Sequence, residues 1–286
     1  MTRRFTRLAW LAAASTYFLI ILGAIVRITG SGLGCGDDWP LCHGRLVPPL
    51  ELAAIIEFAH RQAVVLVTVF VVALAIYAWH LRRVQGNTPP GRAAYVALAL
   101  LGVQVALGAV IVKLALPPLR VVLHLAIAML ILAALLVAAR GHRLTPDASP
   151  GNTGAGSTPG SRPGLVGTIA LVLGFVTVLF GALTANLGAA SACLGFPLCN
   201  GELIPAGNHL QHVHWTHRLL AYALLGYSLW WALRSRRRGA WCVVALVALQ
   251  VVVAATMVLL GLPRPLQAAH VAVGAAVWAG LVLAVW

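Results

Sequence analysis

The sequence predicts an all-α integral membrane protein in which eight transmembrane helices form two tandem four-helix bundles. Of its 286 residues, 61% are hydrophobic and 9% are charged, and the mean hydropathy is +0.93, which excludes an ordinary soluble domain. Lipid cannot hydrogen-bond the backbone, so stretches long enough to cross it are expected to be helices. We assign eight such stretches to residues 8–27, 53–79, 93–113, 121–139, 164–186, 210–232, 240–261 and 267–286.

The second half of the chain repeats the first. The offset between matching residues is 158 at first, 157 in the middle and 146 at the end of each half. It matches Gly23, Cys35, Cys42, Gly44, His60, Arg61, Gln104, Pro117 and His124 with Gly181, Cys193, Cys199, Gly201, His217, Arg218, Gln250, Pro263 and His270. Four helices return the chain to its starting side, so both halves have the same orientation. A pseudo-twofold axis along the membrane normal is therefore expected.

This repeat divides the chain into three parts. Residues 1–139 are the predicted N-terminal half and residues 164–286 the C-terminal half. Residues 140–163 between them are rich in Gly, Pro, Ser and Thr, which is typical of a flexible linker.

The net charge of +14 indicates membrane topology. Thirteen of the 20 basic residues fall on one side of the eight-helix arrangement, which the positive-inside tendency makes cytoplasmic. Both termini and the linker then face the cytoplasm, the cysteine-containing loops face outside, and no nucleic-acid-binding surface is implied. These residues are Arg3, Arg4, Arg7, Arg82, Arg83, Arg92, Arg140, Arg143, Arg162, Arg234, Arg236, Arg237 and Arg238.

The first apolar stretch also fits a signal peptide, because basic residues precede it. Its length and the match of Gly23 with Gly181, inside the fifth stretch, favour a retained helix.

Two cysteine pairs lie in the predicted outside loops. Cys35 and Cys42 flank a Trp-Pro sequence, and Cys193 and Cys199 flank a Phe-Pro sequence. An oxidising exterior favours a disulfide in each pair. Metal binding is the alternative, since His43 adjoins Cys42, but the spacings are longer than those of usual zinc sites. Redox-active thiols in the first pair are a further alternative.

Four histidines are the candidate ligands of a cofactor. His60 and His124 lie near the outside ends of the second and fourth predicted helices, and His217 and His270 repeat this on the sixth and eighth. A single membrane histidine is often a hydrogen-bonded core residue, but four at matched depth indicate function. Two facing imidazoles in a four-helix bundle suit axial ligation of one haem iron. Zinc or copper usually needs further ligands, and none recurs in both halves.

Basic and amide side chains accompany these histidines. Arg61 and Arg218 directly follow His60 and His217 and are predicted to contact haem propionates, although snorkelling to lipid headgroups explains them equally well. The repeated glutamines 104 and 250 fit shared scaffolding or haem contacts better than catalysis.

The halves differ at Glu57. It lies three residues before His60, and the matching residue before His217 is His214. A carboxylate within a span is costly and needs a partner or a chemical purpose. Proton transfer and substrate orientation are the favoured purposes, and structural pairing with Arg61 or Arg27 is the alternative.

At these residues the chain resembles the haem A synthase family. The resemblance rests on GAIVRITGSGLGCGDDWPLCHG, EFAHR and His124 in the first half, and on GALTANLG, CLGFPLCNG, HRLLAY and His270 in the second. It covers all eight predicted helices, and the glycine-rich cysteine loop followed by E-x-x-H-R is its most specific part.

The resemblance implies that the protein oxidises the methyl substituent of haem O to a formyl group, giving haem A for terminal oxidases. It implies that His60 and His124 hold the substrate haem, that Glu57 is essential to the reaction, and that His217 and His270 hold a b-type haem. Two successive hydroxylations would give a gem-diol that loses water, while the protein fixes the macrocycle.

The resemblance also bears on compartment and partners. Cys35 and Cys42 are similar to the family's redox-sensitive pair. Handover of haem O from haem O synthase, a membrane electron acceptor of unknown identity and a homo-oligomer are further expectations.

Two other functions use the same residues. A membrane cytochrome b, passing electrons from quinol through two bis-histidine haems, needs the four histidines but not the Glu57 asymmetry. A transporter with a parallel repeat would use the histidines for proton relay or metal binding.

Overall fold

A computed structural model of the protein describes residues 3–85, 89–141 and 164–286. Within these ranges the chain forms long helices and no strand. Their bounds are α1 (Arg3–Ile28), α2 (Leu52–Gln85), α3 (Pro89–Lys113), α4 (Pro118–Arg140), α5 (Leu165–Asn186), the short 3-10 helix η2 (Ala189–Ser191), α6 (His209–Ser235), α7 (Arg238–Leu259) and α8 (Arg264–Val285). The all-α prediction is confirmed, and each of the eight predicted stretches falls largely within one long helix. The predicted linker lies outside the described residues from residue 142 onward, as do Arg143 and Arg162.

Seven of these helices are long and apolar enough to cross a membrane, so the protein is a multi-pass membrane protein. The exception is α6, which has 27 residues but a more polar sequence. Its first ten residues include four histidines and Arg218. The polar residues that lower the hydropathy of α6 therefore lie in the same segment as the candidate ligand His217.

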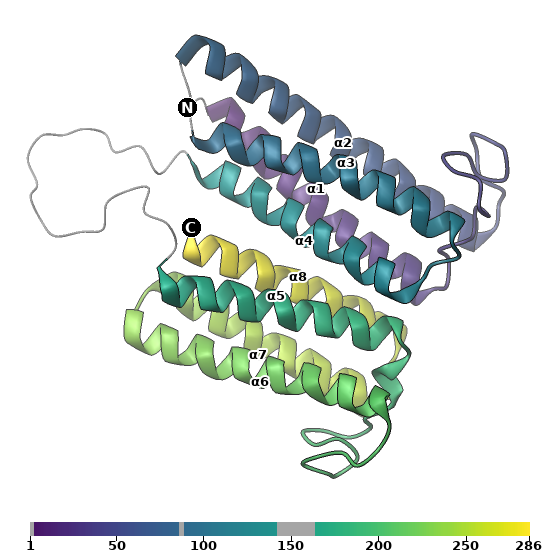
Figure 1. The fold of residues 1–286 in the computed structure, drawn as a ribbon, viewed down its shortest axis with the longest axis vertical. Coiled ribbons are helices and arrows are strands. Elements are labelled where there is room, and N and C mark those ends of the chain that lie inside the picture. The colour runs from purple at the N-terminus through teal and green to yellow at the C-terminus, as the bar shows by residue number, and fades with distance from the viewer. Residues whose placement is uncertain (1–2, 86–88, 142–163) are drawn as a thin grey trace, which may run out of the picture.

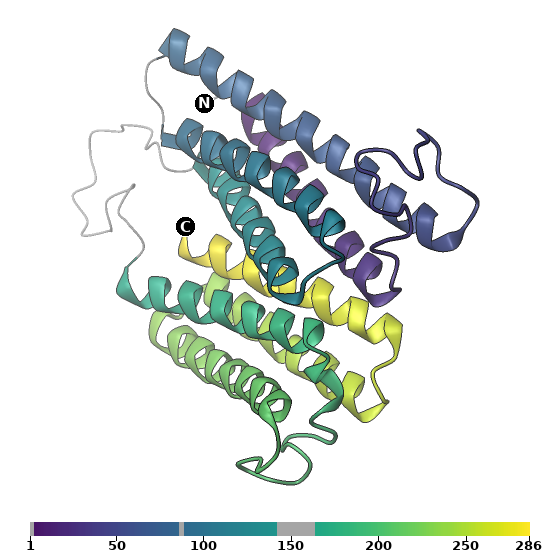
Figure 2. The same cartoon turned by 45° about the vertical axis from the view of Figure 1, so that its right-hand side comes forward.

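The helices lie side by side in two groups along the chain. Helices α1 to α4 lie together in the upper part of Figure 1 and α5 to α8 in the lower part, and the rotated view in Figure 2 agrees. Helix α8 packs against α1 and α4 as well as against α5 and α7. The indole of Trp278 on α8 is buried in the core of the first group and donates to the carbonyl of Met129 on α4, at 2.8 Å.

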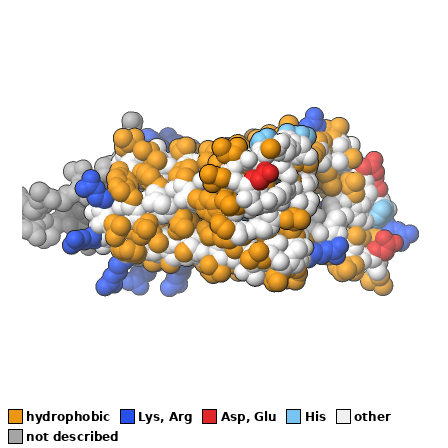
Figure 3. Space-filling view, turned by 90° about the horizontal axis from the view of Figure 1, so that it is seen from below, with side chains coloured by type: hydrophobic (Ala, Val, Ile, Leu, Met, Phe, Trp, Pro, Cys, Tyr) orange, Lys and Arg blue, Asp and Glu red, His pale blue; other side chains and the backbone are white. Residues whose placement is uncertain are grey.

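The two ends of the molecule differ in charge. Helix α1 begins and α8 ends at one end, and the long cysteine loops lie at the other (Figure 1). Figure 3 shows Lys and Arg side chains toward both ends, with more of them at the first, and the acidic side chains toward the second. Many large apolar side chains between the ends face outward, which suits contact with lipid. The acidic side chains among the described residues are Asp37, Asp38, Glu51, Glu57 and Glu202.

Candidate functional site

Both cysteine pairs form disulfides. The sulfur atoms are 2.05 Å apart in Cys35–Cys42 and 1.91 Å apart in Cys193–Cys199, so the disulfide prediction is confirmed. The metal alternative for the first loop finds no support, because the His43 ring bonds the carbonyl of Gly34 through Nε2 at 2.9 Å. The described part of the chain contains no cluster of three or more metal-binding side chains.

The two loops are held by matched hydrogen bonds. His43 and Asn200 occupy equivalent positions, and both adopt positive φ, 51° and 53°. The Asn200 amide donates to the carbonyl of Ala192 at 3.0 Å, as the His43 ring pairs with Gly34. Each loop is thus a folded unit, closed by its own disulfide.

Arg61 ties the first loop to helix α2. Its NH1 donates to the carbonyls of Asp38, Pro40 and Leu41, at 2.9, 3.3 and 2.5 Å. Its NH2 donates to Oε1 of Glu57 at 2.5 Å. The guanidinium therefore anchors the loop and pairs with the carboxylate four residues earlier on the same helix.

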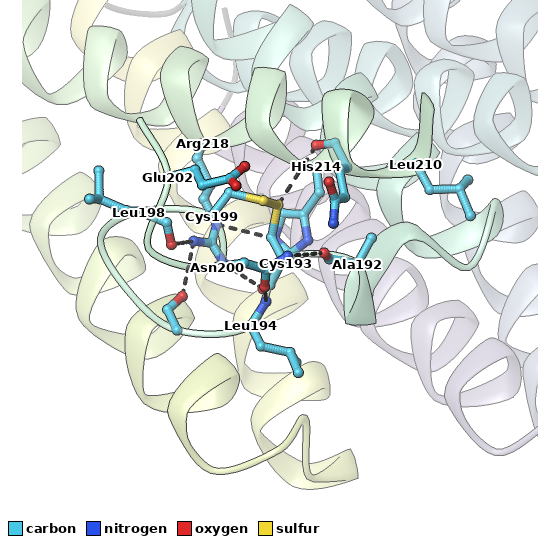
Figure 4. The surroundings of a disulfide bond; sticks show 12 residues. Ala192, Cys193, Leu194, Leu198, Cys199, Asn200, Glu202, Leu210, His214 and Arg218 are labelled. Carbon is cyan, nitrogen blue, oxygen red and sulfur yellow. Dashed lines mark hydrogen bonds between the residues drawn. A yellow bond between two sulfur atoms is a disulfide. The ribbon is translucent and has the colours of Figure 1, made fainter. Parts of the chain in front are cut away.

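Arg218 on helix α6 anchors the second loop through backbone carbonyls in the same way (Figure 4). Its NH1 donates to the carbonyls of Gly195 and Leu198, at 3.0 and 2.8 Å, and its NH2 to that of Cys193 at 2.8 Å. Its Nε donates to Nε2 of His214 at 3.3 Å. Four of its five N–H groups are thus used within the protein.

Glu57 is enclosed between the first loop and helix α2. The residue is 4% exposed, and its two carboxylate oxygens accept from Arg61 NH2 and from the backbone N–H of Cys35, the latter at 2.8 Å. Of the partners considered from the sequence, the structure pairs Glu57 with Arg61. It also links the carboxylate directly to a cysteine of the disulfide, which sequence spacing does not reveal.

His217 and His270 face each other across the second group of helices. Their ring centres are 6.4 Å apart and their planes are almost perpendicular. Two metal–imidazole bonds of about 2 Å each, together with the two ring radii, give roughly 6 Å between ring centres. The His217 Nδ1 bonds the carbonyl of Thr177 at 3.1 Å, which leaves Nε2 as the unprotonated nitrogen, the form that ligates a metal.

His60 and His124 form the corresponding pair in the first group. His60 lies on α2 and His124 on α4. The Nδ1 atom of each ring is buried and forms no hydrogen bond in the described structure. Glycines from neighbouring helices lie against the rings, since a methyl group on Gly23 or Gly108 would lie 3.1 or 3.3 Å from Cε1 of His60 or His124.

The repeated glutamines support the second histidine of each pair. Gln104 donates to the backbone carbonyl of His124, and Gln250 to that of His270, both at 3.0 Å. The Gln250 amide also lies 3.1 Å from Nδ1 of His270. These contacts fit the scaffolding role expected from the sequence. Thr177 had no sequence signal, because it acts through a backbone carbonyl.

Comparison with known proteins gives the family of the chain. Residues 6–282 match the family described as COX15-CtaA, cytochrome oxidase assembly protein. The chain belongs to this family. Among its relatives, a protein named Heme A synthase from Symbiobacterium thermophilum is 35% identical over 84% of this chain and 81% of its own length. Proteins of the same name from Shouchella clausii and Alkalihalophilus pseudofirmus are 30% and 28% identical, over 83% and 80% of this chain and 79% and 75% of their own lengths.

The match to the COX15-CtaA family covers the helices that carry all four candidate ligand histidines. It also covers both disulfide loops and their arginine anchors. The resemblance found in the sequence is thus confirmed over nearly the whole chain.

Proposed function

We propose that this chain is a haem A synthase, an enzyme that oxidises the methyl substituent of haem O to a formyl group. The facing pair His217 and His270, repeated as His60 and His124, is the observation that carries the proposal, because it suits two sites for a flat iron macrocycle. The names of the relatives agree with this activity. The proposed topology follows the charge distribution, with both termini cytoplasmic and the two halves, 1–139 and 164–286, related by a pseudo-twofold axis along the membrane normal.

In the N-terminal half, His60 and His124 hold the iron of the substrate haem. The close approach of Gly23 to His60 supports this role, because the glycine leaves no room for the ring to turn toward α1. The histidines fix the macrocycle so that its reactive methyl is presented in one orientation, which lowers the entropic cost of reaction.

In the C-terminal half, His217 and His270 hold a b-type haem. The residues would fit this group: the ring separation leaves room for an iron between the two imidazoles, and the Nδ1 contact of His217 leaves its Nε2 available to bind that iron. When bound, the haem supplies one-electron redox chemistry. Thr177 and Gln250 hold the rings in place. Arg218 has one N–H group that makes no hydrogen bond within the described protein, and a propionate contact would use that group. Arg61 has two such N–H groups, one on Nε and one on NH2.

Glu57 serves the reaction at the substrate site. Both its oxygens are hydrogen-bonded to donors, so it is held as a carboxylate acceptor that ties the loop to the helix of His60. We assign it to proton movement during the two hydroxylations. Haem O arrives by handover from haem O synthase, the electrons leave to a membrane acceptor, and the protein assembles as a homo-oligomer.

The test is haem extraction and chromatography from membranes that make haem O. Glu57→Gln should abolish haem A while leaving the b-type haem, because the substitution removes the charge at one site only. Glu51→Gln, which changes an exposed carboxylate nearby, is the matched control and should form haem A normally. Normal haem A production by Glu57→Gln would refute the role of Glu57.

A second variant tests the ligand assignment. His217→Ala combined with His270→Ala should lose the stoichiometric b-type haem, and retention of that haem would refute the assignment. A plain cytochrome b would leave haem O unchanged in every variant, including the unmodified protein.

A further inference from the structure

The two arginine anchors have the same geometry but a different charge balance. Arg61 faces the carboxylate of Glu57 at 2.5 Å, so the pair is neutral as a whole. Arg218 is bonded to His214 at the equivalent position. Both arginines also hold their loops through backbone carbonyls, which carry no net charge.

The contacts of His214 define its charge. Its Nδ1 lies 3.0 Å from the carbonyl of Ala189, and a carbonyl can only accept, so Nδ1 carries a hydrogen. Its Nε2 accepts from Nε of Arg218 and therefore carries none. An imidazole with one hydrogen is neutral, whereas arginine stays protonated in proteins.

The charge of Arg218 is consequently uncompensated within the described structure. Arg218 is 6% exposed, so water screens its charge weakly. Glu202 is the acidic residue of this loop (Figure 4), but its side chain is exposed and accepts from the backbone of Ala206. The ion pair between Arg61 and Glu57 has no counterpart between Glu202 and Arg218 among the described residues.

This charge lies beside the second histidine pair. Arg218 directly follows His217, whose ring faces His270. Reduction of a haem adds an electron, so a nearby positive charge stabilises the reduced form more than a neutral pair does. A unit charge about 10 Å from the haem, at an effective dielectric constant of about 20, changes the equilibrium constant for haem reduction roughly tenfold.

We propose that the replacement of a carboxylate by neutral His214 raises the reduction potential of the haem at His217 and His270 above that of the haem at His60 and His124. The inference rests on the proposed function, because it requires a haem at each pair. It assigns Arg218 and His214 as positioning and tuning residues. It also makes the C-terminal haem the more readily reduced of the two.

Redox titration of the full-length protein tests this. The background variant is His60→Ala, so that the C-terminal pair holds the one remaining bis-histidine haem. In that background His214→Glu recreates the neutral pair of the first half and should lower the midpoint potential. A tenfold change in the reduction equilibrium corresponds to about 59 mV for one electron.

His214→Gln is the matched control. Its amide can donate to Ala189 and accept from Arg218 without adding charge. His214→Gln should therefore shift the midpoint potential by less than half of the shift that His214→Glu causes. The reciprocal variant Glu57→Gln, in a His217→Ala background, should raise the potential of the haem at the first pair and provides a test that does not depend on the folding of His214→Glu.

The outcomes distinguish the effect of the charge at residue 214 from the presence of the two haem sites. Equal shifts from His214→Glu and His214→Gln, or no shift from His214→Glu and Glu57→Gln, would overturn this inference while leaving the proposed function intact. Absence of a bis-histidine haem spectrum in the His60→Ala protein would overturn both.

Discussion

Gly181→Ala should weaken haem binding at the second histidine pair. A methyl group on Gly181 would lie 2.8 Å from Cε1 and 3.3 Å from Nε2 of His217, whereas carbon atoms in contact are about 3.5–4.0 Å apart. The ring must retreat by roughly 0.7 Å or more, although its Nδ1 is held by Thr177 on the same helix as Gly181. A strained rotamer costs about 0.5–1.5 kcal/mol, and a weakened hydrogen bond costs about 0.5–1.5 kcal/mol.

These costs together, about 1–3 kcal/mol, correspond to roughly a fivefold to 150-fold loss of haem affinity. The assay is titration of haem-depleted protein, followed by the absorption of the bis-histidine haem. Gly226→Ala is the control, since it lies on the same helix as His217 and a methyl group there contacts nothing within 4 Å. Unchanged affinity in Gly181→Ala, or an equal loss in Gly226→Ala, would show that the glycine does not set the ring position.

Two further predictions concern the outer loops. Without reductant, a thiol reagent should label one cysteine per chain, the exposed Cys242, and all five after unfolding and reduction; labelling of three before reduction would contradict the disulfides. Arg61→Gln should lower the free energy of unfolding in detergent by about 3 kcal/mol, because it leaves the Glu57 carboxylate buried and unpaired. Adding Glu57→Gln should restore part of that loss, and a double variant as unstable as Arg61→Gln alone would count against the ion pair.

The sequence was informative wherever a residue's role follows from its position along a helix. Apolar length predicted the helices, and the repeat predicted which histidines belong together. His217 and His270 are found facing each other because the two residues lie at equal depth on two helices of the same four-helix group, α6 and α8. Helix α6 was expected among the eight apolar stretches, and the structure forms this helix, but its composition is too polar for a membrane span by itself.

The partners of the charged side chains were less predictable. Spacing placed Glu57 on the same helix face as His60, but left open whether the carboxylate serves chemistry or pairs with Arg61 or Arg27. It could not indicate the bond from Cys35 to Glu57 or the carbonyls that Arg61 and Arg218 bind. The N–H donor of Cys35 and the carbonyl acceptors of the two arginines are backbone groups, which have no signature in the amino-acid sequence.

By itself, the sequence determined a duplicated, membrane-embedded helical protein with paired histidines and one internal carboxylate. These properties depend on composition and periodicity, which are local. The tertiary structure decided that each arginine anchors a disulfide loop, and that one anchor is charge-balanced by Glu57 while the other contacts an imidazole. That difference arises because each loop folds back onto a helix. The folding brings together residues that are distant in the sequence, and no local sequence pattern specifies their contacts.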